Sequence, residues 1–266
     1  MNELDLFYSE RLENERLLRG TGQLEAARTV DILSRFLPAP PATIYDIGGG
    51  TGYYAAHFAA QGYDVELLDP VAQHISIARS RQHGPANAVI GDARQLPWAD
   101  HSADCVLLMG PLYHLAERAD RIIALKEAKR VLRPRGLLFA TIIPRWASTL
   151  VGMLEGWISD DAYLKMVETE LDSGSHKRPA SWPRLFVDGF FHNQLDIQSE
   201  VAEAGLHFHR SLSIEGPLWM WPDFETAWSN PTTRSQILEM ARRAEDDPEI
   251  LASSPHVGIL CGNTTE

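Results

Sequence analysis

The stretch Thr43-Ile-Tyr-Asp-Ile-Gly-Gly-Gly-Thr-Gly52 decides the fold of this chain of 266 residues. Residues 43–47 form a short, mainly apolar run that predicts a buried strand, and the pattern from Tyr53 to Gln61 predicts a helix. The glycines between them allow a tight turn and a close approach of a ligand to the backbone. Four glycines in the five positions 48–52 are more than a strand–helix turn without a ligand requires. We therefore expect a ligand-binding loop, with the bare turn as the alternative.

Strands and helices alternate on both sides of this loop. Further strands are expected at 64–68, 88–90, 104–109 and 137–143, with helices at 71–81 and 118–132. Such alternation is typical of a parallel sheet that carries helices on both faces. Beyond residue 143 the pattern predicts two helices in 146–172, a loop at 173–192, a helix at 193–204, a strand at 206–214, helices in 217–255 and a strand at 256–261. Residues 10–37 are expected to be helical, with a break at Gly20 and Gly22.

The composition excludes several classes of protein. The chain has 24 Lys and Arg against 36 Asp and Glu, a net charge of −12, which opposes binding to nucleic acid or to an anionic membrane. The first residues resemble no secretory signal, and no stretch has the roughly 20 apolar residues of a spanning helix, so we expect a cytoplasmic protein. Cys105 and Cys261 are too few for a disulfide framework or a cysteine-rich zinc site. The histidines show no metal-ligand spacing, so no metal is expected, and most should have surface or packing roles.

Three aspartates stand at the carboxyl ends of the first three expected strands. Asp46 precedes the glycine loop and could accept a hydrogen bond from a ligand ammonium. Asp69 follows Gly52 by 17 residues and could bind two ribose hydroxyls, while Asp92 could meet an adenine amino group. The segment Gly50-x-Gly52-x-x-Ala55 also fits a dinucleotide fingerprint, so an NAD(P)-dependent oxidoreductase stays open.

Five motifs together resemble the class I S-adenosylmethionine-dependent methyltransferases. They are Asp46-x-Gly48-x-Gly50-x-Gly52, Leu68-Asp69-Pro70, Gly91-Asp92-Ala93, Asp104-Cys-Val-Leu-Leu-Met-Gly-Pro-Leu-Tyr-His114 and Val131-Leu-Arg-Pro-Arg-Gly136. The likeness covers roughly residues 40–145; the rest resembles a bacterial small-molecule branch only loosely. It implies a Rossmann-like, doubly wound α/β fold with seven strands in the order 3-2-1-4-5-7-6, the last strand antiparallel. Gly49 departs from the family, in which many members have a larger residue.

The resemblance also implies a cofactor and the residues that hold it. The cofactor would be S-adenosylmethionine, which leaves as S-adenosylhomocysteine. The residues that match its binding motifs are Asp46, Gly48, Gly50, Gly52, Asp69, Pro70, Asp92, Ala93, Met109 and Gly110. Met109, Gly110 and Pro111 would border the sulfonium and the acceptor.

We expect the acceptor next to Tyr113 and His114, beyond the fourth strand. His114 could take a proton from the nucleophile, or it could only help to close the pocket; Tyr113 could position the substrate or pack against it.

We expect one domain over 1–266, with a helical cap at 1–37, a cofactor core at 38–145 and lid insertions at 146–192 and 217–255. Six of the seven tryptophans follow the core strands. The residues expected to bind the substrate, with simple packing as the alternative, are Tyr8, Trp146, Phe191, His192, Trp219 and Trp221. Phe7, Arg11 and Arg16 could fold over the cofactor, and Arg19 could reach a carboxylate.

The sequence thus predicts methyl transfer from S-adenosylmethionine to an O or N nucleophile of a small molecule, by in-line displacement. Alignment of donor and acceptor can supply about 7–11 kcal/mol of the barrier, so no metal is required. An oxidoreductase and a non-catalytic, cofactor-binding regulatory protein are the alternatives. A monomer and a homodimer are both compatible with the sequence.

Overall fold

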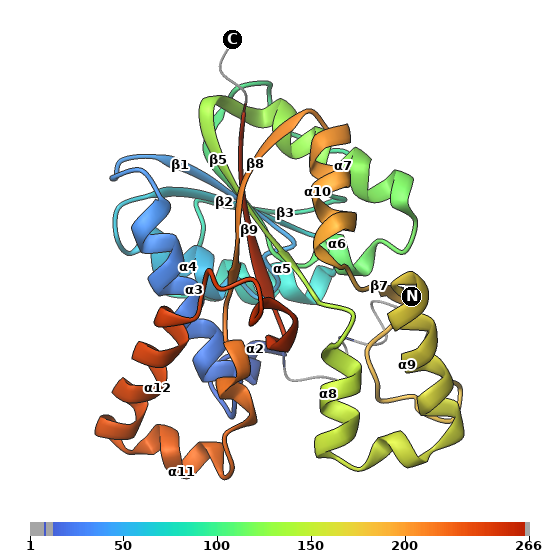
Figure 1. Ribbon diagram of the computed structural model, residues 1–266. Coiled ribbons are helices and arrows are strands. Elements are labelled where there is room, and N and C mark those ends of the chain that lie inside the picture. Colours follow the sequence, from blue (N-terminus) through green and yellow to red (C-terminus); the bar gives the residue numbers. More distant parts are fainter. Residues whose placement is uncertain (1–7, 9–12, 264–266) are drawn as a thin grey trace.

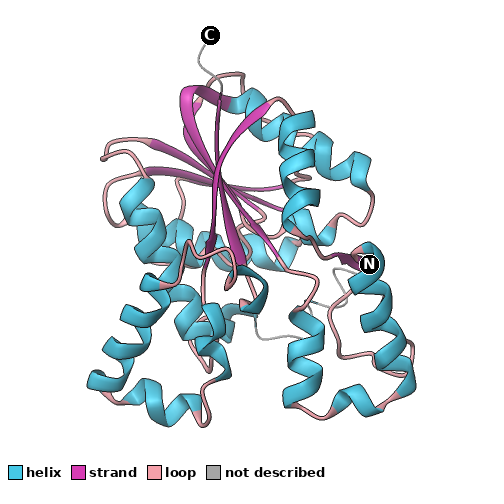
Figure 2. Ribbon diagram, viewed as in Figure 1, coloured by secondary structure: helices cyan, strands magenta, loops and turns pink. Residues whose placement is uncertain are grey.

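A seven-stranded sheet forms the centre of the molecule (Figures 1 and 2). The computed structural model describes Tyr8 and residues 13–263. The strands are β1 Thr43–Ile47, β2 Asp64–Asp69, β3 Asn87–Ile90, β4 Ala103–Leu108, β5 Leu132–Ile142, β8 Leu206–Ser213 and β9 Val257–Asn263. Their spatial order is β3-β2-β1-β4-β5-β9-β8. Because the two intervening strands lie outside the sheet, this is the expected order 3-2-1-4-5-7-6, and the prediction is confirmed.

The strand directions bring several loops to one edge of the sheet. The first five strands are parallel, and Ile47 at the end of β1 pairs with Leu68 in β2 and Leu108 in β4. β9 is antiparallel to both of its neighbours, and its first residue Val257 pairs with Ile142 at the end of β5. The amino end of β9 therefore lies at the same edge as the carboxyl ends of the parallel strands.

Helices cover both faces of the sheet. They are α3 Gly22–Phe36, α4 Tyr53–Ala59, α5 Ala72–Ser80, α7 Arg118–Val131 and α10 Gln194–Glu203. One apolar core packs α7 and α10 against alternate strand residues such as Val106 and Leu108, and the other packs α3, α4 and α5 against Cys105 and Leu107. This alternation in β4 explains its uninterrupted apolar sequence, because both of its faces are buried.

The two insertions extend from the same end of the molecule. The first contains α8 Ala147–Leu154, the 3₁₀ helix η1 Trp157–Ser159, α9 Asp161–Ser173 and a pair of short strands, β6 Ser175–His176 and β7 Gly189–Phe190. The second contains η2 Gly216–Met220, α11 Phe224–Ser229, α12 Pro231–Arg243 and η3 Leu251–Ser253. Figure 1 shows α8 and α9 on one side and α11 and α12 on the other. The expectation of a plain loop at 173–192 was wrong at β6 and β7, since strands of two residues show no periodicity.

The remaining helices are short. At the amino end, α2 Glu13–Arg16 is separated from α3 at Gly20, where the expected break occurs, and α6 Pro111–His114 follows β4. Among the helices of the described chain, none is both long and apolar enough to cross a membrane.

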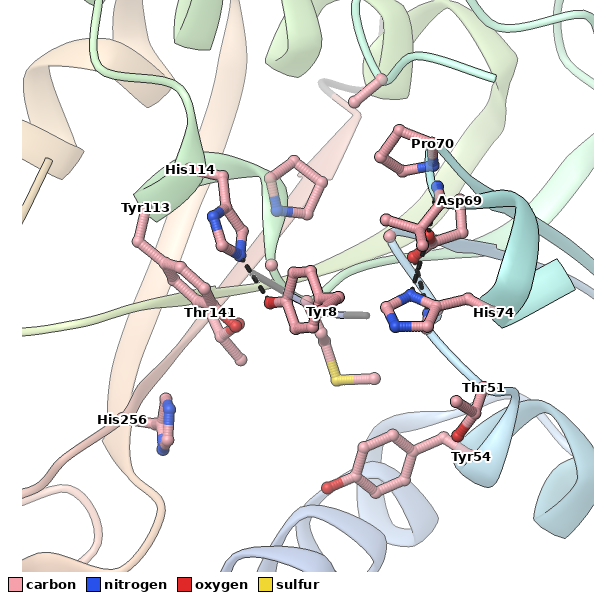
Figure 3. A pocket seen from close by; sticks show the side chains of 18 of the residues that line it. Tyr8, Thr51, Tyr54, Asp69, Pro70, His74, Tyr113, His114, Thr141 and His256 are labelled. Atoms are coloured by element: carbon pink, nitrogen blue, oxygen red, sulfur yellow. Dashed lines mark hydrogen bonds and ion pairs between the residues drawn. The ribbon is translucent and has the colours of Figure 1, made fainter. Parts of the chain in front are cut away.

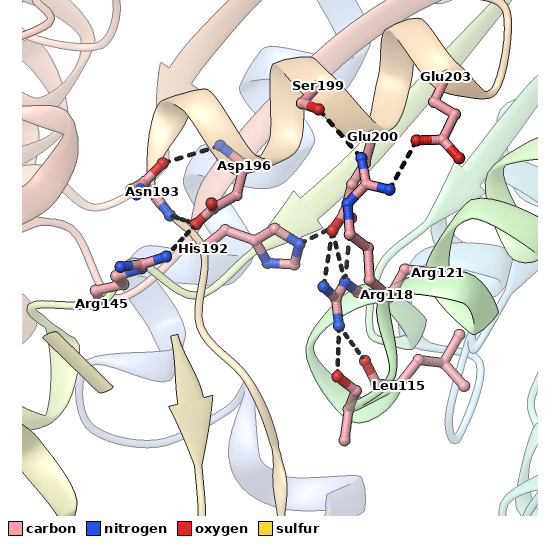
Figure 4. A network of polar contacts seen from close by, with 11 residues as sticks. Leu115, Arg118, Arg121, Arg145, His192, Asn193, Asp196, Ser199, Glu200 and Glu203 are labelled. Carbon is pink, nitrogen blue, oxygen red and sulfur yellow. Dashed lines mark hydrogen bonds and ion pairs between the residues drawn. The ribbon is translucent and has the colours of Figure 1, made fainter. Parts of the chain in front are cut away.

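A buried ion pair joins α7 to α10 (Figure 4). The guanidinium of Arg121 donates to both carboxylate oxygens of Glu200, with Nη2 2.7 Å from Oε1, and both side chains are 1% exposed. Nη1 donates to the carbonyl oxygens of Leu115 and Ala116, at 2.9 and 2.7 Å. The phenyl ring of Phe190 lies 3.7 Å from Cζ of Arg121. These contacts fasten the first insertion to the core of the sheet.

Candidate active site

A cavity of about 520 Å³ opens at the edge where the parallel strands end (Figure 3). Its volume is within the usual range for a site that encloses a small molecule. Of the ten residues expected at the cofactor, eight line it: Gly48, Gly50, Asp69, Pro70, Asp92, Ala93, Met109 and Gly110. Gly52 is the N-cap residue of α4 and packs against Ala78 of α5, and Asp46 lies beneath the loop. The structure therefore brings most of the expected set together in one hollow.

The glycine loop is tied to the end of β2 through Asp69. The carboxylate accepts hydrogen bonds from the amides of Gly50 and Val71, each at 2.9 Å, and Nδ1 of His74 lies 3.0 Å away. Gly50 has φ +55°, and a Cβ there would meet nothing within 4 Å. Its backbone thus faces open space, and a ligand can approach it closely.

Asp46 occupies a position different from the expected one. Its side chain is fully buried, and neither oxygen has a hydrogen-bond partner among the described residues. A Cβ on Gly49 would lie 2.6 Å from its Cγ, so the absence of a side chain at Gly49 makes room for the carboxyl group. Burial, with a smaller effect from Asp69, raises the pKa of Asp46 to about 7. The carboxyl group lies under the loop and does not line the cavity.

Asp92 is exposed rather than buried. Arg94 donates to it from its amide and from Nε, at 2.8 and 2.9 Å, and also pairs with Asp120 at 2.8 Å. The hydrogen bonds from Arg94 hold the pKa of Asp92 below its usual value. Its neighbour Ala93 is buried on the cavity wall.

His114 lines the cavity together with Tyr113 and Tyr8. Nε2 of His114 lies 2.9 Å from the hydroxyl of Tyr8, whose ring also contacts His74, as Figure 3 shows. Nδ1 is buried without a hydrogen-bond partner among the described residues. Burial lowers the pKa of His114 to about 4. The imidazole is therefore neutral at neutral pH and is a weak proton acceptor, which favours the expected alternative of a residue that closes the pocket.

Five of the six expected substrate residues lie outside this cavity, and only Tyr8 lines it. Trp146 and Trp221 are on the surface, 50% and 42% exposed, and Trp219 donates to the carbonyl oxygen of Ser253 at 2.8 Å. Phe191 stacks on His176, and Nε2 of His192 lies 3.2 Å from Glu200 (Figure 4). The first insertion lines the cavity instead with Phe186, Val187 and Asp188. Phe7 and Arg11 lie outside the described residues.

Apart from Arg16, which was expected near the cofactor, the remaining wall consists of residues that the sequence pattern did not single out for the site. Besides Arg16, this wall contains Leu17, Glu25, Thr29, Tyr54, Thr141, Ile143, Ile214 and His256. Arg16, Glu25 and His256 also line a second cavity of about 400 Å³, which Trp219 borders. These residues come from distant parts of the chain, and none belongs to a recognisable motif.

A charged cluster stands between the two cavities. Nδ1 of His256 lies 2.8 Å from Oε1 of Glu215 and 3.8 Å from Oε2 of Glu25, and Arg16 pairs with Glu25. Ligand atoms of the two glutamates and His256 lie within 4.8 Å of one another, as a metal site requires. The guanidinium of Arg16 already neutralises Glu25, so we interpret the group as an ion-pair cluster. His256 thus departs from the surface or packing role expected for it.

Comparison with known proteins agrees with this geometry. A family model described as "Methyltransferase domain" matches residues 45–140. A ubiquinone/menaquinone biosynthesis C-methyltransferase of Rubrivivax gelatinosus, UbiE, is 33% identical over 186 residues, 64% of this chain and 65% of the relative. A malonyl-[acyl-carrier protein] O-methyltransferase of Methylococcus capsulatus is 34% identical over 170 residues, 62% of this chain and 58% of the relative. The chain thus spans less than two thirds of the length of either relative.

Solved structures share the fold at low sequence identity. A Methanosarcina mazei protein described as a SAM-dependent methyltransferase has a TM-score of 0.60 and 18% identity, with 88% of this chain and 98% of that chain covered. The [4+2]-cyclase SpnF has a TM-score of 0.56 and 14% identity, with 93% of this chain and 85% of that chain covered. The sheet order, the glycine loop and the match over residues 45–140 agree with one another: residues 45–140 are similar to the methyltransferase domain, and the chain shares the fold of a protein described as a SAM-dependent methyltransferase.

Proposed function

We propose that this protein transfers a methyl group from S-adenosylmethionine to an oxygen or nitrogen nucleophile of a small molecule. The observation that carries the proposal is the single cavity wall formed by Gly48, Gly50 and Asp69 together with Ala93 and Met109. This arrangement offers backbone and carboxylate groups to a nucleoside joined to an amino acid. One relative is named as a C-methyltransferase of ubiquinone/menaquinone biosynthesis and the other as a malonyl-[acyl-carrier protein] O-methyltransferase. Both names agree with a small or carrier-bound acceptor, and the second agrees with an oxygen nucleophile.

The roles of the individual residues follow from their places. Asp69 is oriented by two amide donors, so its side-chain oxygens can accept hydrogen bonds from ribose hydroxyls. The backbone of Gly48 and Gly50 leaves space for the methionine portion, and Asp92 and Ala93 border the adenine. Asp46 lies beneath the loop, outside the cavity, near the expected position of the ammonium end.

The acceptor lies on the side of the cavity formed by Tyr113, His114 and the segment at Phe186. In-line displacement at a sulfonium needs alignment and exclusion of water, and the chain supplies both by enclosing the two molecules. We propose that residues 1–37 and the insertions 146–192 and 217–255 form this enclosure around the core at 38–145. The first insertion acts through Phe186, Val187 and Asp188.

Calorimetric titration with S-adenosylmethionine, S-adenosylhomocysteine and NAD tests the proposal. We expect binding of the first two and none of NAD, followed by formation of S-adenosylhomocysteine with a suitable acceptor. Binding of NAD without binding of S-adenosylmethionine would instead establish the oxidoreductase. Tight binding of S-adenosylmethionine without turnover of any acceptor in a broad panel would favour a regulatory role.

A further inference from the structure

His256 lies on the side of the cavity formed by β5 and β9, away from Asp69 and His74 (Figure 3). It immediately precedes β9, and Val257 next to it pairs with Ile142. Thr141 and Ile143 of the adjoining strand end line the same part of the cavity. The imidazole is therefore held at the edge of the sheet where the parallel strands end.

Glu215 fixes the orientation of this imidazole. Its side chain is 3% exposed, and Oε1 lies 2.8 Å from Nδ1 of His256. Oε2 accepts from the hydroxyl of Ser254 at 2.9 Å and from the amide of His256 at 3.1 Å. Because a buried carboxylate can only accept, Nδ1 carries the proton, and the lone pair of the neutral ring is on Nε2. Nε2 has no hydrogen-bond partner among the described residues.

The surrounding charges make this histidine a stronger base than His114. Glu215 follows β8, Glu25 is on α3, and Arg16 of α2 partly offsets Glu25. The ring of Tyr113 on α6 lies 6.3 Å away. Burial acts to lower the pKa of His256, but the carboxylates of Glu25 and Glu215 outweigh it and raise the pKa above its usual value. The pKa values of His114 and His256 are thus shifted in opposite directions.

We propose that His256 is the general base of the transfer, that Glu215 is its positioning residue, and that the acceptor carries a phenol or enol hydroxyl. This inference rests on the proposed function. As the bond between sulfur and the methyl carbon breaks, its electron pair stays on sulfur and gives a neutral thioether. The hydroxyl oxygen forms the new bond to carbon, and its proton passes to Nε2 of His256. Glu215 stabilises the imidazolium until the proton leaves to solvent with product release.

The chemistry of the wall favours this class of acceptor. A carboxylate acceptor is already ionised and needs no base, whereas an aliphatic alcohol is a much weaker acid than a phenol and is less easily ionised by an imidazole. The acidity of a phenol or an enol lies between that of a carboxylic acid and that of an aliphatic alcohol. Leu17, Ile143, Ile214 and Phe186 add apolar surface to the cavity that His256 lines, which suits an aromatic or conjugated ring.

Binding of 4-nitrophenol to the complex with S-adenosylhomocysteine tests the inference directly. The phenolate form of this probe absorbs visible light, whereas its neutral form does not. At a slightly acidic pH at which the free phenol is mostly neutral, we expect the wild-type complex to bind it as the phenolate. His256→Asn should reduce the phenolate signal at a given total probe concentration at least about tenfold.

Two further variants separate base strength from structural damage. Glu215→Gln keeps a hydrogen-bond acceptor but removes the charge, so the pH at which bound phenolate appears should rise. The control His207→Asn replaces an exposed histidine of β8 outside the cavity and should behave as the wild type. Thermal unfolding and S-adenosylhomocysteine binding, measured for every variant, show whether the fold and the cofactor site survive.

Each contrary result has a distinct meaning. An equal phenolate signal in the wild type and His256→Asn would overturn the assignment of the base. A complex that binds S-adenosylhomocysteine but no 4-nitrophenol would overturn the class of acceptor and leave the proposed function intact. Failure to bind S-adenosylhomocysteine at all would count against the proposed function itself.

Discussion

The amide nitrogen of Gly50 lies 2.9 Å from Oδ2 of Asp69, so the loop after β1 and the end of β2 form one unit. The same carboxylate caps the turn into α5 through the amide of Val71. A ligand that binds Asp69 therefore meets a side chain whose position is already fixed. Such preorganisation lowers the entropy lost on binding.

Replacement of Asp69 by alanine should weaken binding of S-adenosylmethionine by about 1.5–3 kcal/mol for each charge-assisted hydrogen bond lost. Calorimetric titration measures the change. Asp64→Ala is the matched control, because Asp64 is the exposed first residue of the same strand. Equal affinities of the two variants would remove Asp69 from the site.

Acid should destabilise the protein through His114. Its pKa is about 4 in the folded chain against an ordinary 6.5, so the unfolded chain binds a proton first as the pH falls. The free energy of unfolding should decrease between about pH 6.5 and pH 4. The full pKa shift would correspond to a loss of about 3 kcal/mol, and the loss should be smaller than this because the ring is partly exposed to solvent. Urea denaturation of the wild type and His114→Asn at both pH values measures this difference. A variant that loses as much stability in acid as the wild type would contradict the assignment.

Asp46 should have the opposite pH dependence. Its pKa is raised from 3.8 to about 7, so the folded chain retains a proton that the unfolded chain releases. This carboxyl group therefore reduces stability as the pH rises through that interval, by up to about 4 kcal/mol above pH 7. Asp46→Asn should accordingly be more stable than the wild type at pH 8 and show little gain at pH 4. Denaturant midpoints at the two pH values provide the measurement; a loss of stability at pH 8 would show that the carboxylate has a partner.

The helices α7 and α10 offer a comparison of a buried and an exposed ion pair. Arg121 and Glu200 are each 1% exposed, whereas the side chains of Arg118 and Glu203 on the same helices are 48% and 50% exposed. Glu200→Gln leaves a buried guanidinium without its counter-charge and should cost about 3–5 kcal/mol of unfolding free energy. Glu203→Gln should cost less than about 1 kcal/mol. Chemical denaturation distinguishes them, and similar costs would show that burial does not control the strength of the pair.

The side of the cavity that the glycine loop and Asp69 form was largely predictable from the sequence. Asp69 ends β2 and Ala93 lies just beyond the end of β3, and both strands end at one edge of a parallel sheet, so the two residues lie close together in space. The environment of Asp92 was not predictable in the same way, because its ion pair with Arg94, which also pairs with Asp120, lies at the surface. Asp46 was displaced from the cavity by a packing detail, the space beneath Gly49.

The acceptor side was predicted less well, for two physical reasons. Aromatic content indicates apolar surface but not its direction, and Trp146 and Trp221 proved to be exposed on the outside. His256 escaped notice because catalytic groups were expected after strands, whereas an antiparallel strand brings its beginning to that edge. Its partner Glu215 lies 41 residues away in the sequence, and no spacing rule connects the two.

The position of β9 between β5 and β8 also affects how the protein folds during translation. β9 is the last strand of the described chain, yet both of its neighbours are synthesised before it. During synthesis on the ribosome, β5 is therefore an unpaired edge strand until β9 is made. Its free amide and carbonyl groups can form hydrogen bonds with strands of other polypeptides. Translation products that stop before Val257 are expected to aggregate, so a premature stop late in the message would abolish the protein as surely as an early one.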